Sequence, residues 1–217
     1  MKQSQLSLIN KSKIVFWDFD GIIKESLKVK EKTFLELFKN RKPSELKEIA
    51  LYHRNNGGVS RVKKIKYFYK EIFNIDLPKD RLSELCAKFA LLVENRVVNS
   101  RWAPGVKKIL KNKKKDQLFY LLTGTPDNEI KNITKKLNID NLFEAIYGYP
   151  NNKDKIVREI LRNKMISSKN TLFIGDAKTD YNAAKLNKVP FVLRKNRYNS
   201  ELQKIKSIEI IDNFLIK

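Results

Sequence analysis

The fold is decided by the stretch Ile14–Gly21, which reads IVFWDFDG. Four apolar residues that stop at acidic residues and a glycine are typical of a buried strand that ends in a turn. Side chains alternate along a strand, so Asp18 and Asp20 should share one face while Phe19 points away. The stretch therefore predicts a strand whose carboxyl end carries two carboxylates.

Strands and helices alternate in the second half of the chain. After residue 102 we expect strands at residues 117–122, 143–147, 171–174 and 190–193. Helical spacing of apolar residues predicts helices that end near residues 112 and 137, and others over 154–164 and 181–186. Such alternation predicts an α/β fold with a Rossmann-like parallel sheet and helices on both of its faces. Residues 1–12 are expected to form a loose start.

A helical block separates the first strand from this alternating part. Apolar residues between Ser26 and Val98 recur at helical spacing and indicate four helices without a strand among them. We therefore predict a Rossmann-like core at residues 13–25 and 99–217, with an α-helical domain at residues 26–98 inserted after the first strand. The sequence NNGG at residues 55–58 predicts a loop inside the insertion.

The composition limits the kinds of site that the chain can build. There is one cysteine, Cys86, and one histidine, His53, among 217 residues. An intramolecular disulfide, a cysteine-based metal site and a multi-histidine metal site are therefore excluded. No apolar stretch approaches the roughly 20 residues that a membrane span needs, and the polar first residues lack an apolar signal core. We expect a cytoplasmic protein without a membrane partner.

The charge is strongly positive, with 46 Lys and Arg against 24 Asp and Glu and a net charge of +22. Such a charge attracts anions, including nucleic acids and phosphorylated metabolites. The lysines are spread along the whole chain, and the densest run, Lys107–Lys115, contains no aromatic residue that could stack on bases. We interpret the charge as a compositional bias on solvated surfaces and do not expect nucleic acid as the partner. Nothing in the pattern indicates an oligomeric state.

Polar residues follow three of the expected strands and form, with one lysine, the set Asp18, Asp20, Thr123, Gly124, Lys153, Asp176 and Asp180. The carboxyl ends of parallel strands meet at one edge of a sheet, where ligands bind. Carboxylates gathered there repel one another unless a cation compensates, and oxygen ligands without His or Cys select a hard ion such as Mg²⁺. Such a site suits phosphoryl transfer with an aspartate as nucleophile.

The order of these residues resembles the motifs of the haloacid dehalogenase-like phosphatase superfamily. The matching segments are Asp18-Phe19-Asp20-Gly21, Leu122-Thr123-Gly124, Lys153 and Gly175-Asp176-Ala177-Lys178-Thr179-Asp180, and the resemblance covers about residues 13–195. The helical insertion resembles the cap of the phosphoglycolate phosphatase and β-phosphoglucomutase subgroup.

This resemblance implies roles in catalysis and in phosphate binding. Asp18 is expected to be the nucleophile and Asp20 the general acid and base. Thr123, Gly124 and Lys153 are expected to hold the phosphoryl oxygens.

The resemblance also implies a Mg²⁺ site. Asp18, Asp176 and the backbone carbonyl of Asp20 are expected to ligate the ion. Asp180 is expected to contact the metal through water or to orient Lys153.

The stretch Gly57–Arg61, which reads GGVSR, has two interpretations. It is a plain helix start in which Ser60 is the N-cap, or it is a loop that closes over the site. The second interpretation resembles the substrate loop of β-phosphoglucomutase caps and makes Gly58, Ser60 and Arg61 substrate-binding residues. Arg61 would hold an anionic part of the substrate by forked hydrogen bonds.

These observations predict a Mg²⁺-dependent phosphomonoester hydrolase that acts on a small phosphorylated metabolite, such as a sugar phosphate, through an aspartyl-phosphate. One alternative is a sugar-phosphate mutase, although Lys30 stands where those mutases carry a cap-hinge histidine. Another is a basic nucleic-acid-binding protein without catalysis. Dehalogenases of the superfamily usually lack the second aspartate, so Asp20 favours phosphate chemistry over carbon–halogen cleavage.

Overall fold

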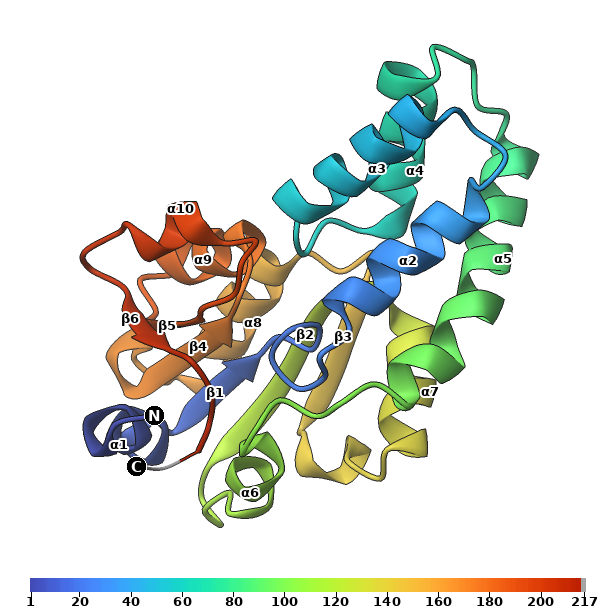
Figure 1. The fold of residues 1–217 in the computed structure, drawn as a ribbon. Helices are drawn as coiled ribbons and strands as arrows, with labels where there is room; N and C mark the ends of the chain where they lie inside the picture. Colours follow the sequence, from blue (N-terminus) through green and yellow to red (C-terminus); the bar gives the residue numbers. More distant parts are fainter. Residues whose placement is uncertain (216–217) are drawn as a thin grey trace.

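The computed structural model describes residues 1–215 and is built around one parallel sheet (Figure 1). Within these residues six strands lie in the order β3-β2-β1-β4-β5-β6, and every neighbouring pair is parallel. The strands are β1 (Ile14–Trp17), β2 (Leu118–Pro126), β3 (Ala145–Tyr149), β4 (Thr171–Gly175), β5 (Phe191–Arg194) and β6 (Glu209–Ile211). This is the strand order of a Rossmann-like sheet, so the predicted fold class is confirmed.

Helices cover both faces of the sheet because its central strands are apolar on both sides. Val15 and Trp17 face the apolar cluster that includes α1, α6 and α7, whereas Ile14 and Phe16 face the cluster that includes α8 and α9. These helices, with the short α10, are α1 (Gln3–Lys11), α6 (Val106–Lys111), α7 (Asp127–Lys136), α8 (Lys153–Lys164), α9 (Lys178–Leu186) and α10 (Ser200–Gln203).

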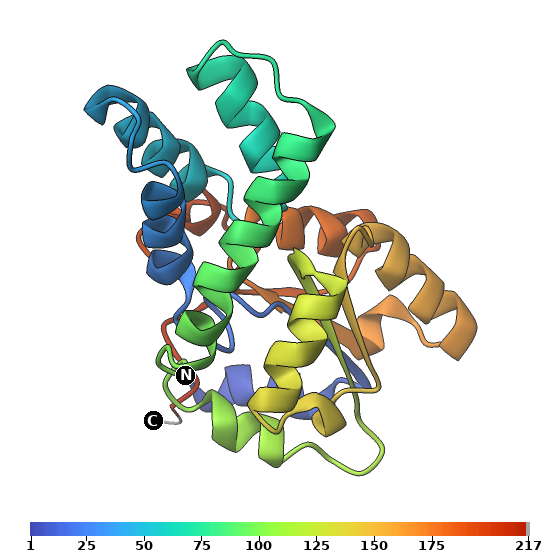
Figure 2. The same cartoon turned by 90° about the vertical axis from the view of Figure 1, so that its right-hand side faces the viewer.

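Four of the five α-helices between β1 and β2, namely α2 to α5, form an insertion that lies over the carboxyl edge of the sheet (Figure 1). They are α2 (Leu27–Leu37), α3 (Pro43–Asn55), α4 (Arg61–Tyr67), which continues into a π-helical turn at Phe68–Ile72, and α5 (Lys79–Val98). Figure 2 shows α5 running from this insertion down towards the core, where it contacts α7. Aromatic rings hold the insertion together; the ring centroids of Phe34 and Phe89, for example, are 4.3 Å apart.

The two connections between the sheet and the insertion lie side by side. Lys24 forms an antiparallel bridge with Trp102. The backbone N–H of Glu25 donates to the carbonyl of Arg101 at 2.8 Å. The ammonium of Lys24 is buried and donates to the carbonyl of Val98 at 2.9 Å, at the end of α5. Both ends of the insertion are therefore fixed to each other at the sheet edge.

The expected loose start at residues 1–12 is wrong, because residues 3–11 form α1. Met1 and Ile9 are buried, and the amide of Gln117 donates to the carbonyl of Ile9 at 2.6 Å. The amino group of Met1 donates to the carbonyl of Leu215 at 2.7 Å, so the two ends of the described chain meet (Figure 1). None of the helices in the described part is both long and apolar enough to cross a membrane.

Strand β2 also continues further than the sequence predicts. It runs through Thr123-Gly124-Thr125 and pairs Pro126 with Tyr149 of β3, after an irregularity in the register. The polar residues expected just beyond the strand therefore lie within it, between the paired positions Leu122 and Pro126. This extension carries Thr123 and Gly124 to the sheet edge beside the end of β1.

Candidate active site

The carboxyl edge of the sheet gathers the residues that the sequence singles out. Asp18 follows β1, Thr123 lies near the end of β2, and Asp176 follows β4, and all three are buried. Lys153 is the first residue of α8 and Asp180 lies in the first turn of α9, and both are also buried. Residues that are up to 162 positions apart in the sequence, Asp18 and Asp180, thus lie in one small site.

Three carboxylates form a tight cluster at this edge. Ligand oxygens of Asp18, Asp176 and Asp180 all lie within 4.8 Å of one another. Burial, with repulsion from Asp180 and Asp20, raises the pKa of Asp18 to about 7 even though Lys153 opposes the shift. Burial and repulsion from Asp18 hold the pKa of Asp176 well above its usual range. The cluster lacks positive charge, which is the electrostatic condition of a cation site.

Lys153 supplies part of the missing charge. Its Nζ donates to Asp18 Oδ1 at 2.7 Å and to Asp180 Oδ1 at 2.5 Å. Burial alone would lower the pKa of Lys153, but the two carboxylates hold it above its ordinary value. Lys153 is therefore a fixed cation, and Asp18 has one oxygen held by it.

Asp180 is occupied by protein partners on both oxygens. Oδ1 accepts from Lys153, and Oδ2 accepts from the backbone N–H groups of Asp176 at 3.2 Å and Ala177 at 3.0 Å. Of the two roles that the resemblance implies for Asp180, contact with the metal through water or orientation of Lys153, the hydrogen bond from Lys153 fits the second.

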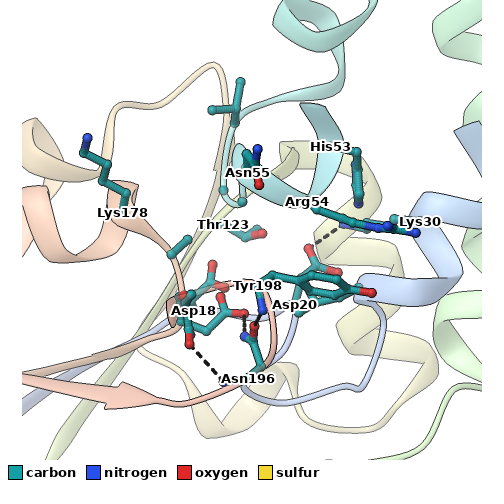
Figure 3. Close-up of a pocket in the computed structure, with 18 of the residues that line it drawn as sticks. Asp18, Asp20, Lys30, His53, Arg54, Asn55, Thr123, Lys178, Asn196 and Tyr198 are labelled. Atoms are coloured by element: carbon teal, nitrogen blue, oxygen red, sulfur yellow. Dashed lines mark hydrogen bonds and ion pairs between the residues drawn. The ribbon is translucent and has the colours of Figure 1, made fainter. Parts of the chain in front are cut away.

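The carboxylate of Asp20 lies apart from this cluster, on the side of the insertion (Figure 3). It accepts from Ser26 Oγ at 2.6 Å, from Lys30 Nζ at 2.5 Å and from Thr125 Oγ1 at 3.2 Å. Burial raises the pKa of Asp20, but Lys30 and the hydroxyl groups outweigh it, so the pKa is lower than usual. Asp20 is therefore held as a carboxylate by a cation from α2.

Thr123 and Gly124 lie where the insertion meets β2. The Oγ1 of Thr123 accepts from the backbone N–H of Thr125 at 3.2 Å and does not cap α7. A Cβ on Gly124 would lie 2.4 Å from the carbonyl oxygen of Gly58. Gly58 itself has φ +73°, and a Cβ there would lie 1.9 Å from Thr179 Oγ1. The loop of the insertion therefore touches the core at positions where only glycine fits.

The structure bears on both interpretations of the stretch Gly57–Arg61, the helix start and the substrate-binding loop. Ser60 is the N-cap of α4 and accepts from the N–H of Lys63 at 3.4 Å. Arg61 lines the cavity, yet its guanidinium donates to Glu129 at 2.7 and 2.6 Å and to the carbonyl of Cys86 at 3.0 Å. The guanidinium N–H groups that were expected to bind the substrate therefore already donate to the carboxylate of Glu129 in α7.

The structure adds residues that the motifs do not include. Asn196 Nδ2 donates to Asp176 Oδ2 at 2.8 Å, and Asn199 Nδ2 donates to the backbone carbonyl of Asp176 at 2.8 Å. Both follow β5, so the same search of strand ends, extended by one strand, would have found them. Tyr198, between them, lines the same cavity. These residues position the Asp176 loop.

A cavity of about 760 Å³ lies between the sheet edge and the insertion. Asp18, Asp20, Thr123 and Asp176 line it from the core. From the insertion, His53 lies beside Lys30, which points at Asp20 (Figure 3). The cavity is large enough for a small metabolite.

The arrangement defines a class: a Rossmann-like α/β enzyme with an acidic, lysine-bearing site beneath a helical insertion. Comparison with known families supports this class and makes it specific. The family model described as haloacid dehalogenase-like hydrolase matches residues 15–193. The chain therefore belongs to the haloacid dehalogenase-like hydrolase family. No curated protein matches its sequence.

Solved structures share the fold over nearly the whole chain. A predicted phosphoglycolate phosphatase from Haemophilus somnus 129pt has a TM-score of 0.75 at 20% identity, covering 94% of this chain and 95% of the other. CbbY from Rhodobacter sphaeroides, in complex with xylulose 1,5-bisphosphate, has a TM-score of 0.73 at 14% identity, with 94% and 95% coverage. β-Phosphoglucomutase from Clostridium difficile has a TM-score of 0.71 at 16% identity, with 94% and 92% coverage.

Proposed function

We propose that the protein is a Mg²⁺-dependent phosphomonoester hydrolase that acts on a small phosphorylated metabolite through an aspartyl-phosphate. One observation carries this proposal: Asp18 lines the cavity with one oxygen fixed by Lys153, and Asp20 lies beside it on the same cavity wall. A carboxylate that is held in place and a second one within reach of the leaving group are the two groups that this chemistry needs.

The acidic cluster fits a magnesium ion. Its donors are all oxygens, the three carboxylates converge within 4.8 Å, and burial leaves them short of positive charge. Asp18 and Asp176 would hold the ion, together with the backbone carbonyl of Asp20 that the family resemblance implies. When bound, Mg²⁺ supplies positive charge that offsets the phosphoryl oxygens and the carboxylates.

In the first step a carboxylate oxygen of Asp18 forms a bond to phosphorus while the bond from phosphorus to the leaving oxygen breaks. The protonated form of Asp20 gives that oxygen its proton and is left as a carboxylate. In the second step this carboxylate takes a proton from the water that attacks phosphorus, and the bond from phosphorus to the Asp18 oxygen breaks to release phosphate. Lys30 lowers the pKa of Asp20, so the resting group is the carboxylate, which is the form that the second step uses. Thr123, the Gly124 N–H and Lys153 would hold the phosphoryl oxygens.

The insertion, predicted as a domain at residues 26–98, would act as a cap on the core at residues 13–25 and 99–217. Its loop touches the core at Gly124 and Thr179, next to the cavity. A closed cap excludes bulk water from the phosphoryl group until the hydrolytic step.

Phosphate release from a panel of phosphorylated metabolites tests the proposal, with Mg²⁺ or with EDTA. We expect release that requires Mg²⁺ and falls by at least about 10³-fold in Asp18→Asn. Asp116→Asn, which changes an exposed aspartate just before β2, is the matched control and should retain full activity. Release that persists in Asp18→Asn, or isomerisation of a sugar phosphate without release, would contradict the proposal.

A further inference from the structure

Lys64 is a buried lysine on the insertion side of the cavity. It lies in α4, is only 4% exposed and lines the cavity. Its Nζ lies 3.1 Å from His53 Nδ1 and 3.4 Å from the backbone carbonyl oxygen of His53. Among residues 1–215, no carboxylate lies within ion-pair distance of Lys64.

The partner of Lys64 is neutral. Burial, followed by the charges of Lys64 and Lys30, holds the pKa of His53 well below its usual range. An ammonium can only donate, so Nδ1 of His53 accepts the hydrogen bond from Lys64 and the ring proton lies on Nε2. The imidazole accepts a hydrogen bond from the ammonium but brings no negative charge.

The other cations that the insertion contributes to the cavity wall are each paired. Lys30 pairs with Asp20 at 2.5 Å. Arg54 pairs with Glu31 at 2.7 Å. Arg61 pairs with Glu129 at 2.6 Å. Lys64 thus differs from its neighbours in lacking a carboxylate among the described residues.

The surroundings of Lys64 make the lack of a carboxylate partner unfavourable for its charged form. Leu27, Phe34 and Phe89 are apolar residues that line the same cavity, and the ring centre of Phe34 lies 5.3 Å from that of His53, the partner of Lys64. The charges that act on Lys64 are those of Lys30 of α2 and, from the sheet edge, of Asp20 and Asp176; Arg54 of α3 acts on its partner His53. A buried ammonium without a counterion is unfavourable, and an anion in the cavity would relieve it.

We infer that Lys64 binds a second anionic group of the substrate, so that the enzyme selects phosphomonoesters that also carry a carboxylate or a second phosphate. This inference rests on the proposed phosphatase function. The reacting phosphate occupies the sheet edge at Asp18 and Lys153, and the second anion occupies the insertion side at Lys64. A phosphomonoester whose other end is neutral leaves Lys64 without a counterion.

Binding of such a substrate is linked to a proton. Burial and repulsion from Lys30 lower the pKa of Lys64 to about 7 in the free protein. An anion bound beside it raises that pKa. Affinity for doubly anionic substrates is therefore fully present below about pH 7 and is lost as the pH rises through the raised pKa of the complex.

Binding is measured by calorimetry with the Asp18→Asn protein and Mg²⁺, so that no turnover intervenes. Two matched pairs separate the possible anions: 3-phosphoglycerate against glycerol 3-phosphate for a carboxylate, and fructose 1,6-bisphosphate against fructose 1-phosphate for a phosphate. We expect the doubly anionic member of at least one pair to bind about tenfold more tightly at about pH 6, and less so at about pH 8.5.

Lys64→Met and Lys64→Gln should both remove this preference, whereas Lys66→Met, an exposed lysine on the same helix, should leave it unchanged. Equal affinity within both pairs, failure to bind any of the four, or a preference that survives in both Lys64 variants would overturn the inference. A preference that depends on Lys64 in a protein that releases no phosphate would leave the inference standing and reject the proposed hydrolysis.

Discussion

At the scale of single residues, the carboxylates of Asp18 and Asp176 work against the stability of the fold. Both have a pKa raised above that of an unfolded chain, Asp18 to about 7 from 3.8. Between about pH 4 and about pH 7 the metal-free folded state therefore holds a proton on Asp18 that the unfolded state has already released, and the raised pKa of Asp176 acts in the same direction. Its stability is complete below that range and falls as the pH rises.

We predict that the metal-free protein loses stability at roughly 1.4 kcal/mol per pH unit between about pH 4 and about pH 7 through Asp18, and loses more through Asp176, whose pKa is also raised. Added Mg²⁺ should raise the melting temperature more at about pH 8 than at about pH 5, because its ligands must be deprotonated. Thermal unfolding with Mg²⁺ or EDTA at both pH values measures this.

The variant Asp176→Asn isolates the effect of the cluster. It should flatten the pH dependence, raise the metal-free melting temperature at about pH 8, and abolish the Mg²⁺ shift. Asp116→Asn should behave as the wild type. A melting temperature that rises with pH in the metal-free protein would show that the cluster does not carry these protons.

Sequence reasoning could find Asp18, Thr123 and Asp176 because each follows or ends a strand, which is a local pattern. It could not assign the partners of Arg61, since Glu129 lies 68 positions away and an ion pair at that separation leaves no trace in spacing. Lys64 was hidden for the same reason. Among 46 basic residues nothing local marks the one that folding buries beside His53.

At the scale of elements, the contact between α4 and α7 ties the insertion to the core. Arg61 is 7% exposed. Its guanidinium donates two hydrogen bonds to the carboxylate of Glu129, and its Cζ lies 4.5 Å from the ring centre of Phe89. Removing one member of a buried pair leaves the other charge without compensation. This contact, rather than surface ion pairs, holds the loop Gly57–Arg61 against the core.

We predict that Glu129→Ala lowers the free energy of unfolding by about 3 kcal/mol. It should also raise the KM for the substrate, because the insertion closes less firmly over the site. Glu84→Ala is the matched control: Glu84 pairs with Arg81 within α5, both side chains are exposed, and the change should be small. Chemical denaturation of the two variants measures the difference, and equal losses would contradict the role of the α4–α7 contact.

The elements that the sequence missed are the ones whose stability comes from distant contacts. Helix α1 has a weak apolar pattern, and its burial depends on Gln117 and on the end of the described chain. Strand β6 has three residues, too few to show alternation, and is defined by pairing with β5. The five strands that were expected lie in apolar runs bounded by turn residues, where local pattern and long-range pairing agree.

At the scale of the whole molecule, the net charge of +22 produces self-repulsion in the folded state. We predict that raising NaCl from about 0.02 M to about 0.2 M increases the melting temperature by a few degrees, because salt screens exposed charges. The shift should be the same in Asp176→Asn, which separates screening of the surface from ion binding at the acidic cluster. A decrease with salt would mean that surface ion pairs outweigh the repulsion.

The insertion leaves the sheet at Ile23–Glu25 and returns at Arg101–Ala103, two segments joined by hydrogen bonds and by the bridge between Lys24 and Trp102. A segment whose ends already touch can be exchanged without closing a new gap in the chain. The core, which carries the proposed catalytic residues, and the insertion, which carries Lys64, can therefore be exchanged independently of each other. On the proposed function, we expect a chimera that carries another helical insertion between the same two points to keep the phosphatase chemistry and to accept a different substrate.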